Sequence, residues 1–139
     1  MATIKRSKER VDKTGEIFTP PELINELLGK LPEEIFSDPS KTFLEPAAGD
    51  GNFLVEVINK KMEHGMTPIQ AIKSTYAIEM MPDNVKKCKE RILELVGDTE
   101  ENKQILNKQI VCAEVKWEKQ KNKLKSYFIK RVDNLEDLF

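Results

Sequence analysis

Hydrophobic residues follow two different repeats along this chain, and the two repeats alternate. Short apolar runs at residues 42–45, 75–79 and 109–113 have the length and the β-branched or aromatic content that is typical of buried strands. Between these runs, apolar residues recur every three or four positions, as on the buried face of an amphipathic helix. Strands that alternate with helices favour right-handed crossovers, so the pattern predicts an α/β fold with a parallel sheet of at least three strands flanked by helices.

The first helix is marked by its N-terminal residues. Thr19 and Glu22 have the spacing of a T-x-x-E capping box, with Pro20 at the first helical position, and apolar residues at helical spacing follow. We therefore expect a helix over residues 20–31, preceded by a basic arm and followed by a loop over residues 32–41.

Four more helices have recognisable ends. One follows a glycine pair and stops at Gly65, and a short one is capped by Thr67. A third begins at Pro82 and ends at Gly97, and a fourth, short helix is capped by Asp98. Each of these helices lies between two predicted strands, as the alternating pattern requires.

Length and composition limit the class of protein. With 139 residues and 39% hydrophobic content, the chain has the size of a single domain over residues 1–139. No stretch approaches the roughly 20 apolar residues that span a bilayer, and the N-terminus has no apolar signal segment, so we expect a soluble, cytoplasmic protein. Cys88 and Cys112 lack the spacing of metal ligands, and no metal site is expected.

The net charge of −1 hides a separation of charge along the chain. Residues 1–15 carry five basic residues against two acidic ones, and residues 116–131 carry seven against one, beginning with Lys116 and ending with Arg131. Both flanks, the N-terminal basic arm (residues 1–13) and the C-terminal segment, are candidates for weak contact with the phosphates of DNA.

The C-terminal segment also has a structural interpretation. Trp117, Leu124 and Phe128 are spaced as on one face of an amphipathic helix, and the lysines between them would then face water. The edge of the predicted sheet would be covered by this segment, by a second copy of the chain in a homodimer, or by a second subunit.

The segment with the most specific chemistry is F-L-E-P-A-A-G-D-G-N-F-L, residues 43–54. Gly49 and Gly51 permit backbone angles that other residues rarely adopt, so the main chain can approach a ligand, and the helix that follows presents unpaired N–H groups. Glu79 ends the second predicted strand, where dinucleotide-binding folds place a carboxylate that accepts hydrogen bonds from ribose hydroxyls. This combination predicts a ligand that contains a nucleoside.

The charge of the same turn selects among such ligands. Glu45 and Asp50 would repel phosphate groups, and the third glycine of a pyrophosphate-binding turn is absent. A ligand that combines cationic groups with an adenosine and lacks phosphate fits better. S-adenosylmethionine has this composition, with a sulfonium and an ammonium group beside its adenosine.

The run E-P-A-A-G-D-G-N-F resembles the glycine motif of S-adenosylmethionine-dependent methyltransferases, of the adenine-N6 type that modify DNA. T-G-E-I-F-T-P-P (residues 14–21) is similar to the family's G-x-[FY]-[FY]-T-P segment, and I-V-C-A-E (residues 110–114) to its third strand, which usually ends in aspartate. The three motifs keep the family's order and extend over residues 13–115. The resemblance implies a Rossmann-like methyltransferase fold, here with a truncated parallel sheet, and S-adenosylmethionine as cofactor.

The resemblance also implies roles for individual residues. Glu45 would bind the ammonium group, Glu79 the ribose and Met80 the adenine ring, although Met80 would also suit ordinary core packing. Glu114 would accept from the adenine amino group, where it departs from the family's aspartate by one methylene. The full set of cofactor-binding residues comprises Phe18, Thr19, Pro20, Glu45, Pro46, Ala47, Gly49, Gly51, Phe53, Glu79, Met80 and Glu114.

The family's catalytic motif, [DNS]-P-P-[YFW], follows the third strand, and this chain has no proline beyond Pro82. We therefore assign no catalytic residue and expect a protein that binds S-adenosylmethionine but transfers no methyl group alone. Two alternatives remain open: an active DNA adenine methyltransferase completed by another chain, and a non-enzymatic module that binds nucleic acid or protein.

Overall fold

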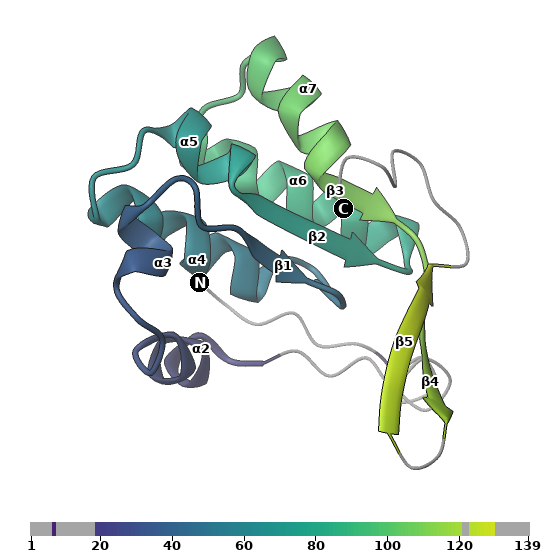
Figure 1. Ribbon diagram of the computed structural model, residues 1–139. Helices are drawn as coiled ribbons and strands as arrows, with labels where there is room; N and C mark the ends of the chain where they lie inside the picture. The colour runs from purple at the N-terminus through teal and green to yellow at the C-terminus, as the bar shows by residue number, and fades with distance from the viewer. Residues whose placement is uncertain (1–6, 8–18, 121–122, 130–139) are drawn as a thin grey trace.

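Three parallel strands form the centre of the structure (Figure 1). The computed structural model describes Ser7, residues 19–120 and residues 123–129 of the chain. The strands are β1 (Phe43–Glu45), β2 (Thr75–Glu79) and β3 (Ile110–Cys112), in the spatial order β1-β2-β3. The predicted parallel sheet of at least three strands is therefore confirmed, and each strand ends within one residue of its predicted bounds.

Six helices flank this sheet in the described part of the chain. They are α2 (Pro21–Leu28), α3 (Glu34–Ser37), α4 (Asn52–Glu63), α5 (Pro68–Lys73), α6 (Pro82–Val96) and α7 (Glu100–Gln109). Helices α4 and α5 connect β1 to β2, and α6 and α7 connect β2 to β3. Right-handed crossovers that proceed in one direction put their helices on the same face of a sheet. One buried cluster from these four helices packs there against Ala77 and Ile110.

Strand β2 contributes to two cores because its side chains alternate between the two faces of the sheet. Ala77 belongs to the cluster beneath the helices, whereas Ile78 packs with Val111, Ala113 and the half-buried Leu44 in a separate cluster. Burial on both faces is the usual condition of a parallel sheet, and it explains why the strand sequences are apolar runs without alternation.

A third cluster attaches the N-terminal helices to the body. Ile24 and Leu28 of α2 pack with Phe36 of α3 and Val57 of α4, and all four side chains are almost fully buried. Phe43 of β1 also contacts this cluster. Helix α2 thus lies beside α4, in the same layer of helices.

The start and end of the first helix differ from the prediction. Pro20 is the N-cap residue of α2 and no side chain caps the helix, so the Thr19–Glu22 capping box is wrong. The helix ends at Leu28, and Gly29 follows as the C-cap residue with right-handed backbone angles. The segment 32–41, predicted as a loop, contains the single turn of α3.

The later helices follow their local signals more closely. Thr67 forms a complete capping box with Gln70 at the start of α5, and α6 begins at Pro82 and ends before Gly97, as predicted. The cap of α7 is Thr99 rather than Asp98: Thr99 Oγ1 accepts from the Asn102 N–H at 3.1 Å. Asp98 instead forms an exposed ion pair with Lys103 of α7 and does not cap the helix.

Beyond β3 the chain forms an antiparallel hairpin, which corrects the prediction of a C-terminal helix. Strands β4 (Val115–Gln120) and β5 (Lys123–Ile129) pair Trp117 with Tyr127 and project from the α/β body (Figure 1). Trp, Tyr, Phe, Val and Ile favour strands, and here that preference outweighs an apolar spacing that also suited a helix. None of the helices in the described part of the chain combines the length and apolar character that a membrane span requires.

Candidate functional site

The predicted glycine turn lies at the carboxyl end of β1. After Glu45 the chain turns through residues 46–51 into α4, and the Ala48 N–H donates to the Ile78 carbonyl of β2 at 3.0 Å. Gly49 and Gly51 have φ angles of 57° and 96°, in the left-handed region that favours glycine. The turn is therefore fastened to β2, and its glycines adopt the backbone angles for which they were singled out.

Glu79, at the end of β2, binds this turn directly. Its Oε1 accepts from the Gly49 N–H at 3.1 Å, and its Oε2 accepts from the Met81 N–H and from Asn84 Nδ2, both at 3.0 Å. A carboxylate has about four acceptor positions, so one remains for a ligand. Glu79 thus joins the glycine turn, β2 and the start of α6, in addition to any contact with ribose.

Gly51 has a packing role that the sequence did not reveal. A Cβ at this position would lie 2.8 Å from Cys88 Sγ and 3.2 Å from Cys88 Cα on α6. The close approach is therefore between the turn and a helix, rather than between the turn and a ligand. Burial raises the pKa of the Cys88 thiol to about 12, so this cysteine is a neutral packing residue.

Asp50 is charge-paired inside the protein. Its side chain is fully buried, and its Oδ2 lies 2.9 Å from Arg91 NH1 of α6. Arg91 NH1 also donates to the Asp50 carbonyl and to Asn52 Oδ1. The prediction that Asp50 repels phosphates is weakened, since Arg91 neutralises its charge. Within the part of the chain that the structure describes, Asp50 Oδ1 has no hydrogen-bond partner.

Asn52 connects the glycine turn to the segment before α2. Its Nδ2 donates to the Thr19 carbonyl at 3.1 Å, and Pro20 follows at the surface. Two of the three predicted motifs therefore meet, although they are separated by 33 residues in the chain. Phe18 lies outside the described residues.

Glu45 is more exposed than Asp50 and Glu79, the other two carboxylates at the glycine turn. Its side chain is half-buried, and Oε1 accepts from the Ala47 N–H at 3.1 Å. Loss of solvation raises the pKa of Glu45, and the hydrogen bond from Ala47 opposes this only partly. A cation beside the second oxygen would restore the interactions that the carboxylate lost with water.

The remaining predicted residues divide into exposed and packed ones. Met80 is 39% exposed at the end of β2, so it is not a core residue in this structure. Ala47 is exposed and Pro46 half-buried in the turn, whereas Phe53 packs beside the α2–α3 cluster. Glu114 is half-buried after β3. Their contacts with a cofactor stay predictions.

Sequence reasoning missed several buried polar residues on helices, among them Asn84, Arg91 and Lys61. Each occupies a helical position between apolar residues of the buried face, which is the signal that would have identified them. Asn84 and Arg91 serve the glycine turn. Among the described residues, no group of three or more His, Cys, Asp or Glu side chains is placed to hold a metal ion.

Lys61 of α4 lies at the opposite, amino end of β2 and is fully buried. Its Nζ donates to the Ser74 carbonyl at 2.9 Å and to the hydroxyls of Ser74 and Thr75, each at 2.8 Å. Burial lowers the pKa of Lys61 to about 8. Gln109 of α7 donates to carbonyls of the same α5–β2 connection, including Lys73 at 2.8 Å.

Comparison with known proteins adds no relative. No family model matches this chain, and neither a curated protein nor a solved structure gives a significant match. The functional assignment therefore depends on the residues of this chain and on the geometry described above.

Proposed function

We propose that this chain binds S-adenosylmethionine at the carboxyl ends of β1 and β2 and transfers no methyl group alone. The observation that carries the proposal is a pair of long-range hydrogen bonds, Asn52 to Thr19 and Gly49 to Glu79. They bring the T-P segment, the glycine turn and the acidic strand end to one edge of the sheet. Ligands of open α/β sheets bind outside the carboxyl ends of the strands.

The charges at this edge favour a cationic ligand. Glu45 has a raised pKa, and no described residue donates to its second carboxylate oxygen, so an ammonium group beside that oxygen would gain a charge-assisted hydrogen bond. Because Arg91 neutralises Asp50, the acidic groups that remain near the turn are Glu45 and Glu79. Two carboxylates still disfavour a phosphate-containing ligand.

The nucleoside end of the cofactor would meet Glu79 and Met80. A ribose hydroxyl can use the one acceptor position of Glu79 that the three protein donors leave. Met80 is an exposed, polarizable apolar side chain on which an adenine ring can rest. When bound, the cofactor would supply an activated methyl group, while this chain's residues would bind and orient it.

Methyl transfer to DNA needs more than this. An adenine-specific enzyme extrudes its target base and holds it by hydrogen bonds and stacking. The sequence lacks the [DNS]-P-P-[YFW] motif that does this in the family it resembles. Labelled methyl groups from S-adenosylmethionine should therefore not be incorporated into adenine by the chain alone, and incorporation above a Glu79→Ala control would contradict this.

Calorimetry with S-adenosylmethionine and S-adenosylhomocysteine tests the binding proposal. We expect saturable heat and a rise in Tm for the natural sequence, and loss of both in Gly49→Val. Gly65→Val is a matched control, because Gly65 also has a positive φ, of 98°, and nothing lies within 4 Å of an added Cβ. Its φ is less favourable for a side chain than the 57° of Gly49, so it should strain the backbone at least as much and leave binding intact.

Two results would contradict the proposal. One is the absence of heat and of any Tm shift at millimolar ligand with the natural sequence. The other is that Gly49→Val unfolds while Gly65→Val folds, which would assign Gly49 to packing rather than to the ligand.

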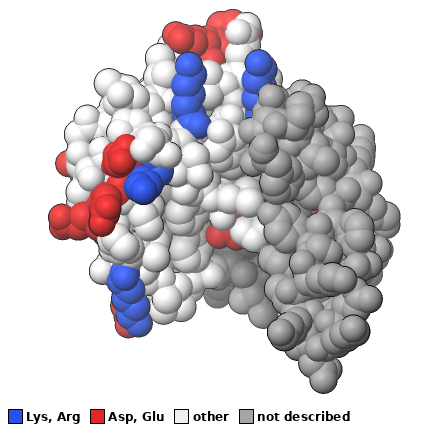
Figure 2. Space-filling view, viewed as in Figure 1, with Lys and Arg blue, Asp and Glu red and all other residues white. Residues whose placement is uncertain are grey.

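The hairpin supports DNA contact as a second candidate function. Residues 116–131 carry a local charge of +6, and the structure gives most of them a two-stranded ribbon, a shape that fits a DNA groove. On the face seen in Figure 2, the basic side chains of the described residues are scattered, some of them beside acidic ones, and form no continuous basic patch. The N-terminal arm, residues 1–13, lies outside the described residues except for Ser7.

Binding to duplex DNA at several salt concentrations tests this second candidate. Each phosphate contact should lower the logarithm of the affinity by roughly 0.7 to 0.9 per decade of salt. A Lys119→Gln, Lys123→Gln, Lys125→Gln variant should reduce that slope. An unchanged slope and affinity would leave the lysines as solvated surface residues.

A further inference from the structure

A series of buried hydrogen bonds connects α6, through the glycine turn, to the segment before α2. Arg91 of α6 donates through NH1 to the Asp50 carbonyl at 3.1 Å and to Asn52 Oδ1 at 2.8 Å. Asn52 in turn donates from Nδ2 to the Thr19 carbonyl at 3.1 Å. Arg91, Asp50 and Asn52 are 6%, 0% and 7% exposed. The network therefore lies away from water, where hydrogen bonds are stronger.

The side-chain amide of Asn52 has only one suitable orientation in this network. A guanidinium has donors and no acceptor, so the group of Asn52 that faces Arg91 must be the carbonyl oxygen. The NH2 group is then directed at the Thr19 carbonyl, which is an acceptor. The opposite orientation would place donor against donor and acceptor against acceptor. Arg91 therefore determines that Asn52 donates to Thr19.

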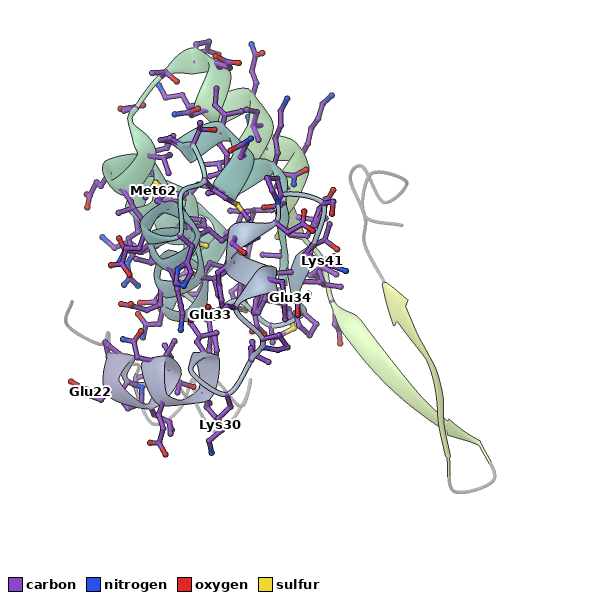
Figure 3. The ribbon with its side chains drawn as sticks, turned by 60° about the vertical axis from the view of Figure 1, so that its left-hand side comes forward. Glu22, Lys30, Glu33, Glu34, Lys41 and Met62 are labelled. Atoms are coloured by element: carbon purple, nitrogen blue, oxygen red, sulfur yellow. The ribbon has the colours of Figure 1, made fainter. Side chains whose placement is uncertain are left out.

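The T-P segment that Asn52 holds, Thr19 and Pro20, lies on the β1 side of the proposed site. Asn52 is the first residue of α4, so the segment lies at the carboxyl end of the sheet. Helix α2 follows the segment and packs on α4 at the margin of the layer of helices (Figures 1 and 3). The cluster of α2 reaches Phe43 of β1, and β1 ends at Glu45. The T-P segment therefore borders the end of the site that is proposed to receive the ammonium group.

The T-P segment is stiff. Pro20 has φ of −69° and ψ of 151°, and Pro21 follows, so the rings restrict both residues. The Pro20 carbonyl accepts from the Ile24 N–H at 3.1 Å, which joins the segment to α2. Among the described residues, the bond from Asn52 is the one hydrogen bond that joins the segment to the sheet or to α4–α7. Its position beside the turn thus depends on the packing of α2 and on that bond.

We propose that Arg91 is a positioning residue for the ligand, because it orients Asn52, which holds the T-P segment as a wall beside the amino-acid end of S-adenosylmethionine. This inference rests on the proposed function and adds to it a residue that acts on the ligand through Asn52. Arg91 also pairs with Asp50, so one guanidinium holds both the turn and the wall. A ligand then meets two surfaces that are already in place, which reduces the cost of ordering them on binding.

Two ligands separate this role from a general effect on the fold. 5′-Methylthioadenosine keeps the adenosine of S-adenosylmethionine and lacks its amino-acid part. Loss of the wall should therefore weaken the binding of S-adenosylmethionine and leave that of 5′-methylthioadenosine unchanged. A general loss of structure would weaken both ligands alike. The quantity to measure is the ratio of the two affinities, by calorimetry with the full chain.

Two variants remove the two steps of the network separately. Asn52→Ala removes the bond to Thr19 and leaves the ion pair of Arg91 with Asp50. Arg91→Lys keeps the positive charge on a shorter side chain without the planar guanidinium. Each should lower the affinity ratio about fivefold, because a loosened wall must be ordered on binding. The double variant should lower the ratio no further than Asn52→Ala alone, since Arg91 acts through Asn52.

Asn107→Ala is the matched control. Asn107 of α7 also accepts a hydrogen bond from a cationic side chain of α6, that of Lys89 at 3.1 Å, but Asn107 is exposed and makes no printed contact with the glycine turn's Asn52 network. Its affinity ratio should equal that of the natural sequence. Hydrogen exchange of the natural sequence needs no variant: S-adenosylmethionine should slow exchange at the Ile24 amide about tenfold, and 5′-methylthioadenosine should slow it much less.

Three results would overturn the inference: equal losses of both ligands in Asn52→Ala, an effect of Arg91→Lys that persists in full when Asn52 is alanine, or an Ile24 amide that both ligands protect equally. If a variant does not fold, the exchange measurement decides. Failure of S-adenosylmethionine to bind the natural sequence would refute the proposed function and this inference with it. Binding with an unchanged affinity ratio in Asn52→Ala would refute this inference alone.

Discussion

Both ends of the parallel sheet contain buried polar side chains, but the hydrogen-bonding groups of these side chains find partners more completely at one end than at the other. At the amino end of β2, the three donors of Lys61 meet three oxygens at hydrogen-bonding distance. At the carboxyl end, no described residue donates a hydrogen bond to Asp50 Oδ1, and the one donor to Glu45 among these residues is the Ala47 N–H. Since buried polar groups are normally satisfied, the saturated end is structural and the unsatisfied end is where a ligand is expected.

The glycine turn at the carboxyl end contains structural contacts as well as the groups that a ligand is expected to meet. Glu79, Arg91 and Asn84 make structural contacts that hold the turn in place. Position 51 requires glycine because Cys88 of α6 lies too close for a side chain. A site held in this way has a fixed shape before a ligand arrives, which reduces the cost of ordering it on binding.

The largest effect is expected from Gly51→Ala, which tests whether the turn is held by packing. The added Cβ meets Cys88 at 2.8 Å on a backbone with φ of 96°, so overpacking and strain together should cost about 3 kcal/mol of unfolding free energy. Urea unfolding measures this. Gly65→Ala shares the positive φ without the contact and should lose only about 1 to 2 kcal/mol. Equal losses would refute the packing role.

The next effect concerns the amino end and its dependence on pH. The pKa of Lys61 is about 8 in the folded protein and near 10.5 when unfolded, so between these values the unfolded chain binds more protons and stability rises with pH. The increase in the free energy of unfolding that is due to Lys61 should reach about 3 kcal/mol by pH 10.5. Lys61→Met should lack it.

Urea unfolding of the natural sequence and of Lys61→Met is measured at pH 7.5 and at pH 10. The contributions of other titrating groups cancel when the unfolding free energies of the two proteins are subtracted. Identical pH dependence of the two proteins would show that the Lys61 ammonium is not destabilised by burial. At pH 7.5, S-adenosylmethionine affinity should be equal in both, because Lys61 lies at the opposite end of β2. A changed affinity would break the division between the two ends.

The smallest effect is expected from Glu45→Gln, which separates ligand binding from stability. Burial raises the pKa of Glu45, so its charged form is disfavoured in the folded protein and the neutral amide should not lower Tm at pH 7. Affinity for S-adenosylmethionine should fall about tenfold, or about 1.4 kcal/mol, through loss of the charge opposite the ammonium. A lower Tm with unchanged affinity would show that Glu45 stabilises the fold and does not bind the ligand.

Several elements could be predicted from the sequence because their signals are local. The Thr67 capping box, the start of α6 at Pro82 and its end before Gly97 all depend on residues that are neighbours in the chain. The parallel sheet followed from the alternation of apolar runs. Where two local signals competed, prediction was less accurate: Thr99 rather than Asp98 caps α7, and the C-terminal segment with its aromatic and β-branched residues forms strands rather than a helix.

The sequence by itself determined which residues form β1, the glycine turn and β2, and it placed Glu45, Gly49 and Glu79 at the ends of those elements. Only the tertiary structure decided what each of them touches. The ion pair of Asp50 with Arg91, the contact of Gly51 with Cys88 and the burial of Lys61 join residues far apart in the chain. Such contacts depend on how helices pack across the sheet, and periodicity identifies a buried face without specifying the partner that covers it.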